Sequence, residues 1–175
     1  DDDFAADWLE LNKGRQIRTF SLSNPKANVR ADSWSLDSVG RPHLVVVIDD
    51  RKFSLSLNVI GKHQIMNALA AIAATDAMGV SEDALITGLA TLMPFKGRMY
   101  PRELGQWRWI DDSYNANPTS MCAAIDALAT LPEPKALVLG RMGELGDTSA
   151  ALHAQVGEYA ARAGIKKLFT SGDVA

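Results

Sequence analysis

The sequence has little cysteine and no long hydrophobic run, and each absence excludes a class of protein. Cys122 is the single cysteine among 175 residues, so no intrachain disulfide can form. This fits a reducing compartment. No apolar run approaches the roughly 20 residues that a helix needs to cross a bilayer. The start shows no signal-peptide pattern. We therefore expect neither a disulfide scaffold nor membrane insertion.

An excess of positive charge is also missing. The formal net charge is −3, which argues against a nucleic-acid partner bound through an overall positive field. With 47% hydrophobic and 22% charged residues, the composition is that of an ordinary globular protein that can bury a sizeable core. The chain opens with "DDDF" and no methionine. We therefore expect it to be an excised piece of a longer protein.

Several catalytic signatures are absent as well. There is no G-x-x-x-x-G-K-[ST] phosphate loop and no G-x-G-x-x-G segment. The three histidines lack metal-ligand spacing, and one cysteine cannot build a zinc site, so we assign no metal ligand. No Ser-His-Asp set can be argued from residue order. We therefore name no catalytic residue.

Residues 1–96 are predicted to combine antiparallel strands with helices. The run "FSLSLNV" alternates apolar and polar residues, as a half-buried antiparallel strand does, and "DDR" before it suits a hairpin turn. Ser81 is a predicted N-cap, with two acidic residues after it. The expected helices span 4–12, 63–78 and 82–92, and the expected strands span 17–22, 43–50 and 52–60.

Residues 97–175 are predicted to begin a Rossmann-like parallel sheet. A linker at 94–98 precedes a hairpin formed by 98–104 and 107–112. Strands 107–112, 135–140 and 166–172 then alternate with helices 118–131 and 149–164, which indicates right-handed crossovers. The sheet would be unfinished. Because its open edge could pair with a second copy of the chain, a non-native dimer is one possible outcome.

The stretch "DDSYNANP" places an unusual number of polar groups after a strand. Asn117 followed by Pro118 suits a helix N-terminus, so a turn and a cap are one interpretation. That interpretation leaves Tyr114 and Asn115 unexplained. In a parallel α/β sheet, ligands bind outside the carboxyl ends of the strands, where a carboxylate such as Asp112 can hold ribose hydroxyls. A ligand site is therefore the second interpretation.

Two other polar clusters have a plain and a functional interpretation each. His63, Gln64 and Asn67 lie at the start of a predicted helix, either as a solvated face or as amides that approach a nucleotide. Arg98 in "KGRM" is either an exposed linker residue or a bidentate phosphate ligand.

The loop "GRMGELG", residues 140–146, follows the predicted strand "KALVL". We expect it to share a sheet edge with "DDSYNANP", because both follow the carboxyl end of a strand. Its three glycines are weak as a signature. His153 is predicted to be a helix residue without a chemical role.

The motifs "GKHQIMNALAAIAA", "FKGRM", "IDDSYNANPTSM" and "LGRMGELG" occur in this order, and together they resemble the Mur ligase family of peptidoglycan synthesis. "DSYNANP" is typical of the member that adds D-Ala-D-Ala to UDP-N-acetylmuramoyl-tripeptide. The resemblance covers essentially the whole chain. It implies that residues 1–96 are the C-terminal half of the central ATPase domain, and that residues 97–175 are the N-terminal part of the C-terminal domain.

The resemblance further implies a bacterial cytoplasmic amide ligase that uses ATP and Mg²⁺ and proceeds through an acyl phosphate. The Mg²⁺ ligands and the phosphate loop are expected upstream, so the 175 residues alone are expected to be inactive. The residues implied to bind the nucleotide are Gln64, Asn67, Arg98, Asp112, Tyr114, Asn115 and Asn117.

Two departures and two alternatives accompany the resemblance. Gln64 stands where the family usually has Asn, and Arg141 stands where an acidic residue is usual. A folylpolyglutamate synthetase-like ligase would share the architecture and the chemistry, although "DSYNANP" argues against it. A non-catalytic binding module that retains half a nucleotide cleft is the alternative outside enzymology.

Overall fold

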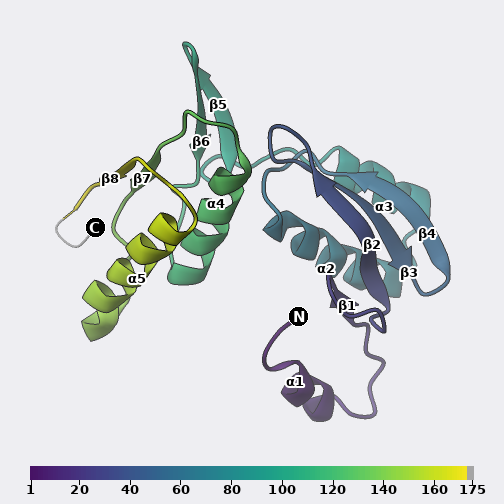
Figure 1. Ribbon diagram of the computed structural model, residues 1–175. Coiled ribbons are helices and arrows are strands. Elements are labelled where there is room, and N and C mark those ends of the chain that lie inside the picture. Colours follow the sequence, from purple (N-terminus) through teal and green to yellow (C-terminus); the bar gives the residue numbers. More distant parts are fainter. Residues whose placement is uncertain (173–175) are drawn as a thin grey trace. The chain divides into compact units, whose positions relative to one another are not determined.

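The computed structural model describes residues 1–172 and divides the chain into two compact units (Figure 1). Short segments of each unit interrupt the other along the sequence. Unit 1 comprises Asp1–Asp37, Pro42–Asn58 and His63–Leu92, and unit 2 comprises Ser38–Arg41, Val59–Lys62 and Met93–Ala175.

Unit 1 is built on a four-stranded sheet in the order β1-β2-β3-β4. Its strands are β1 (Phe20–Ser21), β2 (Val29–Leu36), β3 (Pro42–Ile48) and β4 (Arg51–Ser56). β1 pairs with β2 in parallel, and the other neighbours are antiparallel. Ile48 pairs with Arg51 across a two-residue turn, which confirms the predicted hairpin. In β4, buried Phe53 and Leu55 alternate with exposed residues, as the sequence predicted.

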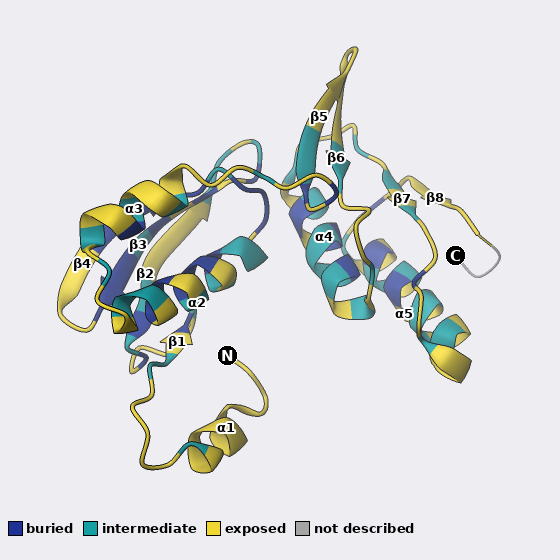
Figure 2. Ribbon diagram, turned by 180° about the vertical axis from the view of Figure 1, so that it is seen from behind, coloured by how far each residue is buried: buried dark blue, intermediate teal, exposed yellow. Residues whose placement is uncertain are grey.

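Three helices accompany this sheet. α2 (His63–Ala77) packs across β1, β2 and β3, and α3 (Glu82–Ala90) packs beside β4. The Ser81 side chain accepts a hydrogen bond from the amide of Ala84, so the predicted N-cap is confirmed. α1 (Ala5–Leu11) buries none of its residues (Figure 2). α2 therefore supplies the main helical part of the core of unit 1.

Unit 2 contains two separate pairs of strands and two helices. β5 (Tyr100–Leu104) and β6 (Trp107–Asp111) form an antiparallel hairpin. β7 (Leu137–Leu139) pairs in parallel with β8 (Leu168–Thr170). α4 (Pro118–Thr130) and α5 (Ser149–Arg162) pack against each other, and the short 3-10 helix η1 (Gly146–Thr148) precedes α5. The fold is therefore mixed α/β, with antiparallel strands in both units and a parallel pair in unit 2.

The core of unit 2 lies between α4, α5 and one face of the β7–β8 pair. Its buried members are Met121, Ile125, Met142, Val156, Ala160 and Ile165. Leu137 and Leu139 of β7 pack against this cluster, whereas Val138 and its partner Phe169 are 53% and 58% exposed. A second cluster joins Ile60, Met99 and Ala127. The β7–β8 pair is thus covered on one face only within the described residues.

The strand predictions differ from the structure in three places. β2 was not predicted, because "VRADSWSL" alternates poorly and contains a register shift between Ala31 and Ser33. The strand expected at 17–22 is reduced to β1. Among the described residues β6 pairs with β5 and not with β7. The predicted parallel alternation therefore holds for β7 and β8 only.

The helices and the tryptophans each show a further property of the described residues. No helix within residues 1–172 is both long and apolar enough to cross a membrane. All four tryptophans are exposed: Trp8 by 58%, Trp34 by 40%, Trp107 by 57% and Trp109 by 48%. The indole rings therefore take no part in either core.

Candidate functional site

In unit 2, residues 97–99 run beside residues 112–114 at the open end of the β5–β6 hairpin. The amide of Tyr114 donates to the carbonyl of Gly97 at 2.9 Å, and the amide of Met99 donates to Oδ1 of Asp112 at 3.0 Å. Beyond them, Tyr100 pairs with Asp111 in the hairpin ladder. We call residues 97–99 and 112–114 the strand-end clasp. It holds the linker and the polar loop together.

The backbone of the clasp requires unusual conformations. Gly97 has φ +79°, and a Cβ at this position would lie 3.2 Å from the Cβ and the amide nitrogen of Tyr114. Met99 has φ +48°, and its side chain is only 4% exposed, in the cluster with Ile60 and Ala127. The buried side chain and the bond to Asp112 keep Met99 in the left-handed region, which a residue with a Cβ rarely adopts.

The guanidinium of Arg98 lies over the ring of Tyr114, 4.2 Å from the ring centroid. Both residues are exposed, and Tyr114 by 63%. A cation over an aromatic face is attracted by the ring quadrupole, which restricts a long and flexible side chain. The edge N–H groups of the guanidinium remain able to bind an anion in a bidentate manner. Arg98 is therefore a cation held in place at the surface.

The two neighbouring carboxylates have different roles. Asp111 accepts hydrogen bonds from the hydroxyl and the amide of Ser113, at 2.6 and 3.2 Å, and these bonds lower the pKa of its carboxyl below the ordinary value. Asp112 is exposed and uses Oδ1 for the amide of Met99. Its Oδ2 accepts no bond from the described residues. Asp112, fixed by its bond to Met99, therefore offers Oδ2 as an acceptor to a ligand hydroxyl.

Of the remaining polar residues of this loop, one stabilises the local structure and another keeps a hydrogen-bond donor available. Asn117 caps α4: its side chain accepts from the amide of Ser120 at 2.9 Å, and the Ser120 hydroxyl accepts from the amide of Asn117. The cap interpretation thus holds for Asn117 and Pro118. Asn115 accepts from the amide of Ala116 through Oδ1 and has an exposed side chain. Its amide nitrogen is available as a donor.

The predicted amide pair lies in unit 1, on the first turn and a half of α2. Nδ2 of Asn67 donates to Oε1 of Gln64 at 3.1 Å, and Nε2 of Gln64 lies 3.1 Å from Nε2 of His63. Asn67 is exposed and Gln64 is half-buried. The longer Gln64 side chain therefore still forms a defined hydrogen-bonded row with its two neighbours.

The structure brings Arg98, Asp112 and Tyr114 together in the clasp, with Asn115 and Asn117 directly after it. Gln64 and Asn67 form a separate pair in the other unit. Sequence reasoning missed Met99, whose backbone amide fixes Asp112, because nothing in its residue type signals a positive φ. No group of three or more His, Cys, Asp and Glu among residues 1–172 could hold a metal ion. We therefore assign no Mg²⁺ ligand to this chain.

Two protein families match the chain, one in each half. Residues 1–75 match the family described as Mur ligase middle domain, and residues 97–175 match Mur ligase, glutamate ligase domain. The mixed α/β units and the clasp are thus parts of an amino-acid ligase architecture. The chain belongs to the Mur ligase family.

The relatives point to one branch of this family. The UDP-N-acetylmuramoyl-tripeptide–D-alanyl-D-alanine ligase of Escherichia coli K12 is 37% identical over 166 residues, which are 94% of this chain and 36% of the relative. A crystal structure of MurF from Acinetobacter baumannii gives a TM-score of 0.93 at 32% identity. The match covers 100% of this chain and 38% of that structure.

A third comparison adds a bound nucleotide. MurF ligase from Thermotoga maritima in complex with ADP gives a TM-score of 0.77 at 25% identity, over 97% of this chain and 43% of that structure. The chain thus spans between 36% and 43% of the length of these three proteins. Its similarity to the MurF branch extends over nearly its whole length.

Proposed function

We propose that this chain is part of an ATP-dependent ligase that joins D-Ala-D-Ala to UDP-N-acetylmuramoyl-tripeptide. The observation that carries the proposal is the strand-end clasp, which holds a cation, Arg98, and a carboxylate, Asp112, at the end of one hairpin. A nucleotide presents the two complementary groups, a chain of phosphates and a ribose diol. The names of the relatives supply the two substrates.

Each clasp residue has a distinct task in this proposal. The stacked guanidinium of Arg98 binds phosphate oxygens, and the open oxygen of Asp112 accepts from a ribose hydroxyl. The exposed ring of Tyr114 supports Arg98, and Asn115 and Asn117 shape the loop. Gln64 and Asn67 are proposed to contact the adenine, since amides both donate and accept. ATP supplies the phosphoryl group that activates the substrate carboxylate.

The domain assignment belongs to the same proposal. Residues 1–96 correspond to the later half of a central ATPase domain, and residues 97–175 to the first part of a C-terminal domain. The Mg²⁺ ligands are proposed to lie in other parts of the longer protein, where a phosphate loop would also be found. A bacterial cytoplasmic location is expected of an enzyme whose substrates are cytoplasmic precursors. The ADP complex of the Thermotoga relative supports nucleotide use.

The test is ADP formation by the longer protein that contains this chain. We expect ADP release that requires both UDP-N-acetylmuramoyl-tripeptide and D-Ala-D-Ala. Arg98→Ala and Asp112→Ala should each raise the KM for ATP by about 10- to 150-fold, because each removes a charge-assisted hydrogen bond of about 1.5–3 kcal/mol.

Arg162→Ala is the matched control for Arg98→Ala. Arg162 is 69% exposed in an ion pair with Glu158, so its removal should leave the KM for ATP unchanged. Dependence on glutamate in place of D-Ala-D-Ala would instead assign a folylpolyglutamate synthetase-like reaction. An unchanged KM in both clasp variants would show that the clasp has no role in binding the nucleotide. No ADP formation by the longer protein would favour a non-catalytic binding module.

A further inference from the structure

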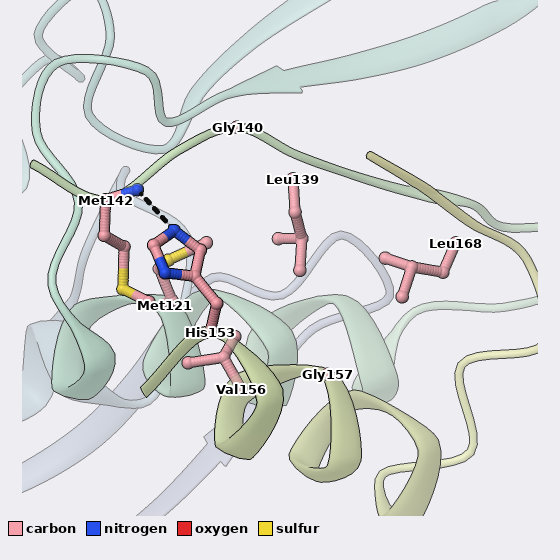
Figure 3. A pocket seen from close by; sticks show the side chains of 8 residues that line it. All are labelled: Met121, Leu139, Gly140, Met142, His153, Val156, Gly157 and Leu168. Atoms are coloured by element: carbon pink, nitrogen blue, oxygen red, sulfur yellow. Dashed lines mark hydrogen bonds between the residues drawn. The ribbon is translucent and has the colours of Figure 1, made fainter. Parts of the chain in front are cut away.

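The imidazole ring of His153 connects helix α5 to the loop 140–146 that follows β7. Its Nε2 lies 2.9 Å from the amide nitrogen of Met142 (Figure 3), and its Nδ1 lies 2.7 Å from the carbonyl oxygen of Ser149. The ring thus bridges the backbone of the loop and the first turn of the helix.

These two partners determine the protonation state of the ring. A backbone amide can only donate, so Nε2 must carry a lone pair, and a carbonyl oxygen can only accept, so Nδ1 must carry the proton. The hydroxyl of Ser149 is also near Nδ1, at 3.4 Å, but the carbonyl is closer. His153 is therefore neutral with its proton on Nδ1. A second proton would place an N–H against the N–H of Met142.

The described residues that line the space around the ring include no second titratable group. His153 lines a cavity of about 20 Å³. Met121 of α4, Leu139 of β7, Leu168 of β8 and Val156 of α5 also line it. The charged residues nearest in sequence are Arg141 and Glu144 of the loop and Asp147 of η1, and all three are exposed. Apart from His153, the described residues that line this cavity are therefore apolar.

The loop held by His153 shares its core with the polar loop of the candidate site. Met142 is 1% exposed and belongs to the same cluster as Met121, on the first turn of α4. Ala116 of the "DDSYNANP" stretch and Leu145 of the glycine-rich loop both pack against that cluster. The loops after β6 and β7 are therefore neighbours within unit 2, although β6 and β7 are not paired.

We propose that neutral His153 is a positioning residue for the ligand site of unit 2. It holds the loop 140–146, with exposed Arg141 and Glu144, in one conformation beside the loop that carries Asp112. Loops after the carboxyl ends of parallel strands are where α/β folds bind ligands, and β7 is such a strand. Only the expected effect on kcat/KM rests on the proposed ligase function.

The bond itself is tested by NMR on the 175-residue chain. Long-range ¹H–¹⁵N correlations should show the Nδ1–H tautomer of His153 at neutral pH. A ring with the proton on Nε2 would overturn the proposal.

Two substitutions separate positioning from packing. His153→Gln retains an acceptor near the place of Nε2, whereas His153→Phe retains an aromatic ring without an acceptor. In the longer ligase we expect His153→Phe to lower kcat/KM about tenfold, since one hydrogen bond to a backbone amide is lost. His153→Gln should recover most of this loss, because its side-chain carbonyl can accept from the amide of Met142.

The two proposals can fail separately. If the unsubstituted protein forms ADP with both substrates but His153→Phe matches its kcat/KM, the positioning role is wrong and the ligase function stands. If Phe and Gln lower kcat/KM equally, an acceptor near the place of Nε2 does not restore activity, which also overturns the positioning role. If the unsubstituted protein is inactive while the tautomer is as expected, the ligase function fails and the His153 bond stands.

Discussion

Gly97 shows how one residue without a side chain makes the clasp possible. Its left-handed backbone directs its carbonyl to the amide of Tyr114, and the space that a Cβ would need is occupied by Tyr114 itself. The stacking of Arg98 on Tyr114 depends on the same close approach. The position of Arg98, the candidate phosphate-binding residue, therefore depends on Gly97, which has no side chain to bind a ligand.

Gly97→Ala is expected to destabilise unit 2 by about 1–3 kcal/mol, because the left-handed conformation is strained for alanine and the new Cβ meets backbone. Urea unfolding followed by circular dichroism measures the change. Gly105→Ala is the matched control, since Gly105 has φ +59° but a Cβ added there would meet no atom within 4 Å. An equal loss of stability in the two variants would show that the contact with Tyr114 costs nothing.

The residues of the site differ in how well the sequence predicted them. Asp112 and Arg98 carry charge at a strand end and in a linker, so residue type and place along the chain make them candidates, with two interpretations each. Met99 binds Asp112 through its amide and has a positive φ, and His153 accepts from the amide of Met142, eleven residues away. Backbone hydrogen bonds of this kind leave no pattern in a single sequence.

At the level of elements, an ion-pair network joins the end of α2 to the β3–β4 turn. Asp76 accepts from both Arg18 and Arg51, and Arg18 also pairs with Asp49 at 2.7 Å. The side chain of Asp76 is only 7% exposed. Burial raises its pKa, but the bonds from Arg51 and Arg18 outweigh burial, and the net pKa is below the ordinary value. Asp76 is therefore charged and paired in the folded unit.

The network predicts a loss of stability in acid. A carboxyl whose pKa is lower in the folded state stabilises the fold above its unfolded pKa, near 4, and this contribution disappears as the pH falls through the folded value. Asp76→Asn should remove the contribution at neutral pH, at a cost of about 1–3 kcal/mol, because two arginines lose a buried partner. Denaturant unfolding at pH 7 and pH 3 measures this. The free energy of unfolding should differ less between the two pH values in Asp76→Asn than in the unsubstituted protein.

Asp32→Asn provides the control for this experiment. Asp32 pairs with Lys52 at 2.7 Å, but both side chains are about half exposed, so the ion pair is screened by solvent. We expect no measurable change in the free energy of unfolding at pH 7. A loss as large as that of Asp76→Asn would contradict the view that burial gives the Asp76 network its importance.

Most elements could be predicted because their signals are local. The helices α2, α3, α4 and α5 follow apolar periodicity and begin near capping residues, and each lies within two residues of its predicted bounds. The strand β2 has four exposed residues in a row and a register shift, so its pairing depends on β3 and not on its own pattern. The pairing of β6 likewise depends on which neighbour reaches it.

For the whole molecule, the proposed function assigns only part of the catalytic site to this chain. The proposal places groups for a ribose and for phosphates in it, and the sequence lacks a G-x-x-x-x-G-K-[ST] loop. The 175-residue chain by itself is therefore expected to form no ADP in the presence of ATP, Mg²⁺ and both substrates. A coupled assay for ADP checks this, with the longer protein as the positive control. Turnover that requires both substrates would contradict the prediction.

The exposure of all four tryptophans decides how these experiments can be read. An indole that already contacts water in the folded state emits near the wavelength of the unfolded chain, so its fluorescence changes little on denaturation. Trp8, Trp34, Trp107 and Trp109 are each at least 40% exposed. The native protein should therefore have red-shifted emission that acrylamide quenches readily. Tryptophan fluorescence should therefore change little when the protein unfolds, whereas the far-ultraviolet circular dichroism of its helices should report the transition.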